Sequence, residues 1–78
     1  MMKDKIKNII ADITERKVEE ISFDLELVDE LEIDSMMSLE ILTDLERDFD
    51  IVVTEEDFAN FITVNDIYEL VKEKVNEK

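Results

Sequence analysis

Hydroxyl groups are the side chains through which this sequence could do covalent chemistry. The 78 residues include no Cys, His, Gly, Pro or Trp. Without Cys and His there is no thiolate nucleophile, no Ser-His triad and no zinc site with nitrogen or sulfur ligands. Without Gly the chain lacks the Walker loop and the dinucleotide fingerprint, whose backbones must approach phosphate closely. We therefore expect a protein that is not an enzyme, in which Ser and Thr hydroxyls are the candidate sites of modification.

Ser35 stands apart from the other hydroxyl-bearing residues in its expected position. Thr54 and Thr63 each precede an acid by three residues and fit helix capping boxes. Asp34 and Ser35 lie where a long loop should pass into a helix, and either residue is a favoured N-cap, so capping alone could explain them. A phosphate ester on Ser35 would also be favoured there, because free N–H groups and the positive end of the helix dipole stabilise an anion.

The charge of the chain restricts its partners. Its 23 Asp and Glu residues against 9 Lys and Arg residues give a net charge of −14. This charge opposes binding to nucleic acids and anionic membranes and favours partners with basic surfaces. An EF-hand loop begun at Asp48 would need Gly and Glu where Val53 and Ala59 stand, so we expect no dedicated metal site. No apolar run approaches the about 18 residues of a membrane span, and no signal-peptide core is present, so we expect a cytoplasmic monomer without stable membrane insertion.

Helices should position these side chains, because the absence of Gly and Pro removes the usual turns of β-hairpins. Apolar residues at three- and four-residue steps predict a first helix over residues 2–16. Residues 17–33 lose this period and are predicted to form a long loop held by buried apolar anchors. A second helix is expected over 35–49, a short one over 54–61 and a final one from Thr63. The basic residues that suit the end of the final helix are Lys72, Lys74 and Lys78. The predicted fold is all-α, a small four-helix bundle of three longer helices and one short helix.

The second helix divides into a core face and an exposed face. At 100° per residue the core arc consists of Ser38, Ile41, Leu42, Leu45 and Phe49, with Leu39 at its edge. The opposite face carries Met36, Glu40, Asp44 and Arg47. An apolar side chain, Met36, is therefore expected to lie exposed next to Ser35.

The segment from Leu31 to Ile51 resembles the acyl carrier protein family around its Asp-Ser-Leu/Met attachment motif, here Asp34-Ser35-Met36. The resemblance extends over one carrier-like domain, residues 1–78. It implies that a phosphopantetheinyl transferase attaches 4′-phosphopantetheine from coenzyme A to Ser35, and that the new thiol carries acyl groups as thioesters. The implied partners are this transferase and acyl-loading and acyl-processing enzymes with basic surfaces. The implied function is that of a carrier in fatty-acid, polyketide-type or related lipid biosynthesis.

The resemblance also implies which residues partners recognise. Asp34 matches the acid before the modified serine, and Met36 matches the apolar residue after it. Glu40 and Glu46 match acidic positions that engage basic patches, although Glu46 falls nearer the core edge of the helix. Asp44 joins this set through its place on the exposed face.

Three positions depart from the family pattern. Met37 replaces an acid common in fatty-acid carriers, and Arg47 brings a positive charge into the acidic face. Members often have Gly near the position of Glu32, so here the loop must turn without it. These departures indicate a specialised carrier, and we include Met37 and Arg47 among the residues that partners read.

Two alternatives stay open: a D-alanyl or aminoacyl carrier, and an unmodified acidic module that binds a basic partner through its second helix.

Salt and divalent cations should stabilise this protein. Self-repulsion at a net charge of −14 destabilises the compact state, and both reagents weaken it by screening. We expect the melting temperature to rise with added NaCl and with millimolar-scale divalent cations, as measured by thermal unfolding. A melting temperature indifferent to both would contradict this expectation.

Overall fold

Four α-helices make up the regular structure of the protein. A computed structural model describes residues 1–77, so the expected helix-end residue Lys78 lies outside the described part. The helices are α1 (Met2–Thr14), α2 (Ser35–Phe49), α3 (Glu55–Ala59) and α4 (Val64–Asn76), and a short 3-10 turn, η1 (Val18–Glu20), follows α1. The predicted all-α bundle with three longer helices and one short helix is confirmed. Among residues 1–77, no helix combines the length and apolar composition needed to cross a bilayer.

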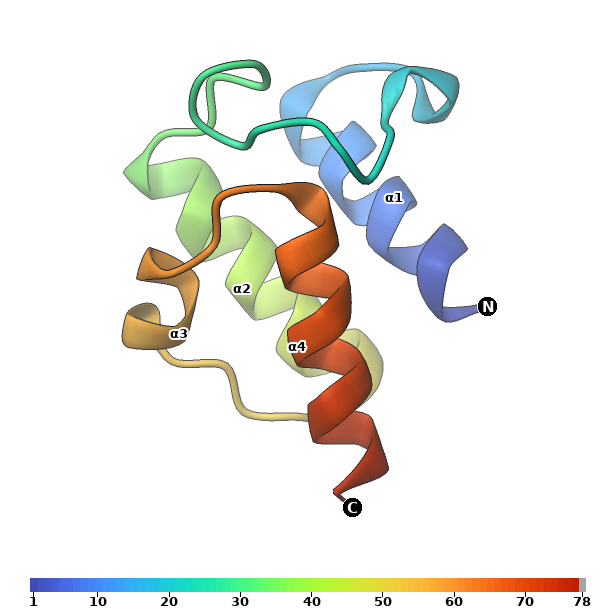
Figure 1. Ribbon diagram of the computed structural model, residues 1–78, viewed down its shortest axis with the longest axis vertical. Helices are drawn as coiled ribbons and strands as arrows, with labels where there is room; N and C mark the ends of the chain where they lie inside the picture. The colour runs from blue at the N-terminus through green and yellow to red at the C-terminus, as the bar shows by residue number, and fades with distance from the viewer. Residues whose placement is uncertain (78) are drawn as a thin grey trace.

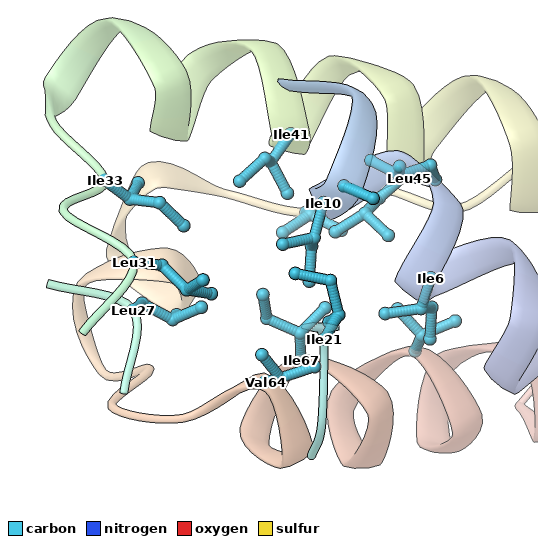
Figure 2. Packing of buried hydrophobic residues seen from close by; sticks show 14 of the residues in the cluster. Ile6, Ile10, Ile21, Leu27, Leu31, Ile33, Ile41, Leu45, Val64 and Ile67 are labelled. Carbon is cyan, nitrogen blue, oxygen red and sulfur yellow. The ribbon is translucent and has the colours of Figure 1, made fainter. Parts of the chain in front are cut away.

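The core lies between α1, α2 and α4, while α3 packs mainly on α2 (Figure 1). An ion pair also joins α3 to α4, since Lys74 Nζ lies 3.6 Å from Asp57 Oδ2. The fully buried core side chains from the three long helices are Ile6, Ile10, Ile41, Leu45, Val64, Ile67 and Val71. Figure 2 shows Ile41 and Leu45 directed from α2 toward the side chains of α1 and α4. The predicted core arc of α2 is therefore confirmed at its centre. Leu39, at the predicted edge, is 50% exposed.

The long segment between α1 and α2 crosses one end of the bundle (Figure 1). Leu27, Leu31 and Ile33 are buried, which confirms that apolar anchors hold it. Backbone hydrogen bonds also fix it to the chain before α4, since the Leu27 N–H donates to the Ile62 carbonyl at 2.8 Å. The Val64 N–H in turn donates to the Leu25 carbonyl at 3.0 Å. Sequence periodicity gave no sign of this pairing, because neither partner has the pattern of a strand.

The helix starts follow the predicted capping chemistry. The Asp57 N–H donates to Thr54 Oγ1 at 2.9 Å, and the Thr54 N–H donates to Asp57 Oδ2 at 3.1 Å. The hydrogen bond from the Thr54 backbone lowers the pKa of Asp57, because it stabilises the ionised carboxylate. At α2 the cap is Asp34, whose Oδ1 accepts from the Met37 N–H at 2.9 Å. Ser35 is therefore the first residue of the helix and not its cap.

Two predicted helix ends were wrong by two residues. The first helix ends at Thr14 and not at residue 16, because Glu15 takes a left-handed conformation with φ 56°. The short helix ends at Ala59 and not at residue 61. Left-handed conformations also occur at Glu32 (φ 58°) and Asp50 (φ 53°), positions that glycine would favour. Charged residues thus make these turns at a conformational cost.

Replacing Glu32 by Gly should stabilise the fold. A left-handed non-glycine residue costs about 1–2 kcal/mol, and the entropy that Gly loses on folding offsets part of this gain. We expect Glu32→Gly to raise the free energy of unfolding, measured by urea denaturation, by about 0.5–1 kcal/mol. Glu69→Gly is the matched control: it removes the same charge from an exposed site inside α4 and should lower stability by about 1 kcal/mol. A loss of stability in Glu32→Gly would overturn this explanation of the turn.

Asp34 and Ser35 should differ in their effects on stability. Asp34→Ala removes the cap of α2 and should lower the free energy of unfolding by about 1 kcal/mol, whereas Asp34→Asn should keep most of it. Ser35→Ala should change stability by less than about 0.5 kcal/mol, because the hydroxyl caps nothing. Urea denaturation of the three variants makes this comparison. Equal losses in Asp34→Ala and Ser35→Ala would show that both side chains cap the helix.

Candidate functional site

The start of α2 presents Ser35 to solvent. Ser35 is exposed, and within residues 1–77 its hydroxyl has no hydrogen-bond partner. Met37 N–H is already bonded to Asp34, so the cap does not involve the serine. The chain has no His or Cys that could serve as a base for this hydroxyl. The geometry suits a nucleophile that another protein activates, or a residue that another protein modifies.

A hollow of about 270 Å³ opens beside Ser35, between α2 and α3. Its lining consists of Ser35, Ser38, Leu39, Leu42, Glu55, Phe58 and Ala59. Most of these side chains are apolar, and the Phe58 ring is held edge-on to Phe61 with centroids 5.0 Å apart. The hollow therefore lies between the exposed Ser35 hydroxyl and apolar side chains of α2 and α3.

Sequence reasoning missed this hollow. The helical pattern places Leu42 on the core arc of α2 and Leu39 at its edge, and it does not indicate which part of α2 the short helix covers. The shortness of α3 indicates the hollow, because its five residues are too few to cover the side of α2 that Leu39 and Leu42 occupy. A short helix against a long one leaves part of the long helix uncovered.

The exposed face of α2 begins at Met36. Met36 is 73% exposed, which confirms the predicted exposure of an apolar side chain next to Ser35. Leu39 and Glu40 are also exposed. Apolar and acidic groups therefore lie within one or two turns of the serine, a combination that suits a protein partner with apolar and basic groups.

Farther along α2, Arg47 binds two carboxylates. Its Nη2 lies 3.1 Å from Asp44 Oδ1, and its Nε lies 3.2 Å from Asp48 Oδ1. The hydrogen bond to Asp48 and the charge of Asp44 raise the pKa of Arg47 above its ordinary value, so the guanidinium stays charged. Asp44, predicted as an exposed recognition residue, is half-buried and forms an ion pair with Arg47.

Two further residues of the predicted recognition set lie away from this exposed face. Glu46 Oε2 accepts the Val53 N–H at 2.9 Å, so its carboxylate fixes the segment that leaves α2. Met37 is half-buried and packs against the core cluster. Both side chains support the fold directly. The helix wheel already placed Glu46 near the core edge, but the hydrogen bond to Val53 depends on how the following segment folds back.

Comparisons with known proteins agree on one family. A family model described as the phosphopantetheine attachment site matches residues 4–71. An acyl carrier protein of Rickettsia bellii is 36% identical over 69 residues, which cover 88% of this chain and 85% of that protein. Polyketide-8 synthase acyl carrier protein 2 of Streptomyces avermitilis is 27% identical over 75 residues, covering 96% and 86%.

A solved structure agrees with the sequence matches. A Mycobacterium tuberculosis chain named as an acyl carrier protein superposes with a TM-score of 0.86 and 33% identity, covering 94% of this chain and 97% of that chain. Matches of this extent concern the whole helical bundle and not a local motif. The chain therefore belongs to the acyl carrier protein family, whose members carry covalent 4′-phosphopantetheine and act as carriers rather than enzymes.

Proposed function

We propose that Ser35 is the attachment residue for 4′-phosphopantetheine and that the protein carries acyl groups on this arm. The observation that carries the proposal is the position of Ser35 at the first residue of α2. Asp34 takes the cap, so the Ser35 hydroxyl is exposed and has no hydrogen-bond partner among residues 1–77. A phosphopantetheinyl transferase can reach such a hydroxyl without breaking any contact of the fold.

The start of α2 also suits the phosphate that joins the arm to the serine. The first N–H groups of a helix lack intrahelical partners, and here Asp34 uses that of Met37. The N–H groups of Ser35 and Met36 remain at the positive end of the helix dipole, which favours an anion. When bound, the group supplies the thiol that this cysteine-free chain lacks, and that thiol holds an acyl group as a thioester.

The hollow beside Ser35 supports an acyl cargo over an aminoacyl one. Its walls include Leu39, Leu42 and Phe58, against which an apolar chain would lose contact with water. The ammonium group of D-alanine would gain nothing from those walls, because a charge is costly to remove from water. We infer an acyl group of the fatty-acid or polyketide type. The departures at Met37 and Arg47 favour a specialised pathway over general fatty-acid synthesis.

Partners should dock on the exposed start of α2. Acyl carrier proteins work with a phosphopantetheinyl transferase and with acyl-processing enzymes, and here Met36 and Glu40 offer an apolar and an acidic contact close to Ser35. We infer that the enzymes which use this carrier present a basic residue toward Glu40. The contact then lies within reach of the arm.

Intact mass tests the assignment of Ser35. Incubation with coenzyme A and a phosphopantetheinyl transferase should add the mass of one phosphopantetheine to the wild-type protein and none to Ser35→Ala. Ser38→Ala is the matched control, since it removes a half-buried hydroxyl one turn away and should be modified like the wild type. Circular dichroism should show the same helix content in all three proteins.

Two outcomes would contradict the proposal. One is a wild-type protein that gains no mass; the other is a Ser35→Ala variant that still does. The rival function, an unmodified acidic binding module, predicts that Ser35→Ala keeps full biological activity. The carrier function predicts instead that Ser35→Ala keeps its fold but loses all activity, because the attachment hydroxyl is removed.

A further inference from the structure

The outward face of α2 changes its charge along the helix. Met36, Glu40 and Arg47 share this face. The seven-residue step from Glu40 to Arg47 makes about two turns, about 10.5 Å along the helix axis. The end near Ser35 is apolar and acidic, and the far end carries an exposed guanidinium, with the Arg47 side chain 67% exposed. A partner that lies along α2 meets both ends.

Most of the acids on α2 are already paired within the protein. Asp44 and Asp48 bind Arg47 at 3.1 and 3.2 Å, and Glu46 accepts the Val53 N–H. Of the four acids on this helix, Glu40 alone has no hydrogen bond or ion pair within residues 1–77. Glu40, near Ser35, is therefore the acid of α2 that a docking partner can bind without competing with a contact among residues 1–77.

The far end of α2 borders a mixed-charge hollow. A space of about 380 Å³ between α1 and α2 is lined by Lys5, Asn8, Ile9, Asp12, Asp44, Arg47 and Asp48. Two cations and three carboxylates face it, which leaves a net charge of −1. A basic partner surface must approach Lys5 and Arg47 there as well as the carboxylates, whereas Glu40 has no ion pair within residues 1–77.

Stability does not account for Arg47. Its ion pairs join side chains that are 67%, 28% and 34% exposed, and exposed pairs of this kind contribute only about 0–1 kcal/mol. The larger effect of Arg47 is on the surface potential that a partner meets, since it lowers the net charge of its group with Asp44 and Asp48 from −2 to −1 and places a cation between the two carboxylates.

We propose that Arg47 is a specificity determinant that confines the acidic docking surface to the Glu40 end of α2. The partner that fits presents a base opposite Glu40 and no base opposite Arg47, two helix turns away. Enzymes with a continuous basic surface along the whole of α2 are disfavoured. This inference rests on the proposed carrier function and adds to it the charge pattern of the partner.

The test measures phosphopantetheinylation by a transferase whose docking surface is continuously basic. Arg47→Gln and Arg47→Glu should lower KM progressively and leave kcat unchanged, because they restore negative charge away from the reacting hydroxyl. For Arg47→Glu we expect KM to fall about fivefold at low salt, with the difference lost at high ionic strength. Arg47→Gln keeps good helix propensity, so it gives the answer even if the additional acid in Arg47→Glu perturbs α2.

Arg16→Glu is the matched control for net charge. Arg16 lies beyond the end of α1 and donates to the Glu30 carbonyl at 3.4 Å, so it belongs neither to α2 nor to the hollow that Arg47 lines. The Arg16→Glu substitution should leave KM close to that of the wild type. In a complementary series, single basic residues of the transferase are changed to Gln; the change at the base opposite residue 47 should raise KM for Arg47→Glu more than for the wild-type carrier.

The outcomes separate this inference from the function on which it rests. If every Arg47 variant is modified with the wild-type KM, or Arg16→Glu shifts KM equally, the role of Arg47 is overturned while the carrier function stands. If none of the proteins, wild type included, is modified, both proposals fail. If no transferase variant raises KM for Arg47→Glu more than for the wild type, the predicted contact opposite residue 47 is wrong.

Discussion

The hydrogen bond from the Met37 N–H to Asp34 Oδ1 determines how α2 presents its side chains. At 2.9 Å it caps the helix and makes Ser35 its first residue. The helical period then sends Ile41 and Leu45 into the core and leaves Met36 and Glu40 in solvent. Moving the start by one residue would rotate every side chain by about 100°. The exposure of Ser35 and of the proposed docking face thus follows from one cap.

The long segment before α2 holds this cap in place. Leu27, Leu31 and Ile33 are buried, and the Ile33 N–H donates to the Leu27 carbonyl at 2.9 Å, so the chain arrives at Asp34 in a fixed direction. Glu32 makes the last turn in a left-handed conformation that glycine would adopt without strain. Burial of the apolar anchors, at about 1.5–3 kcal/mol for each side chain, outweighs the cost of that turn.

The sequence predicted features that depend on local periodicity and capping. The limits of α2, the burial of Ile41 and Leu45 and the exposure of Met36 follow from one amphipathic pattern. Features that depend on distant segments were not predictable: the pairing of the long segment with the chain before α4, the hollow under α3, and the hydrogen bond from Val53 to Glu46. Composition could not distinguish Asp34 from Ser35 as the cap, because both are good caps.

This chain has no Cys, His or Gly. Under the proposed function it contributes one hydroxyl, and its partner enzymes supply the catalysis. Its acids are less available than the net charge of −14 suggests, because Arg47, Val53 and the capping boxes engage several of them.

The most direct measurement is mass spectrometry of proteolytic fragments of the protein isolated from its native cells. We predict one phosphopantetheine, with or without an acyl group, on the fragment that contains Ser35. An unmodified fragment throughout the population, or the group on another hydroxyl, would contradict this account.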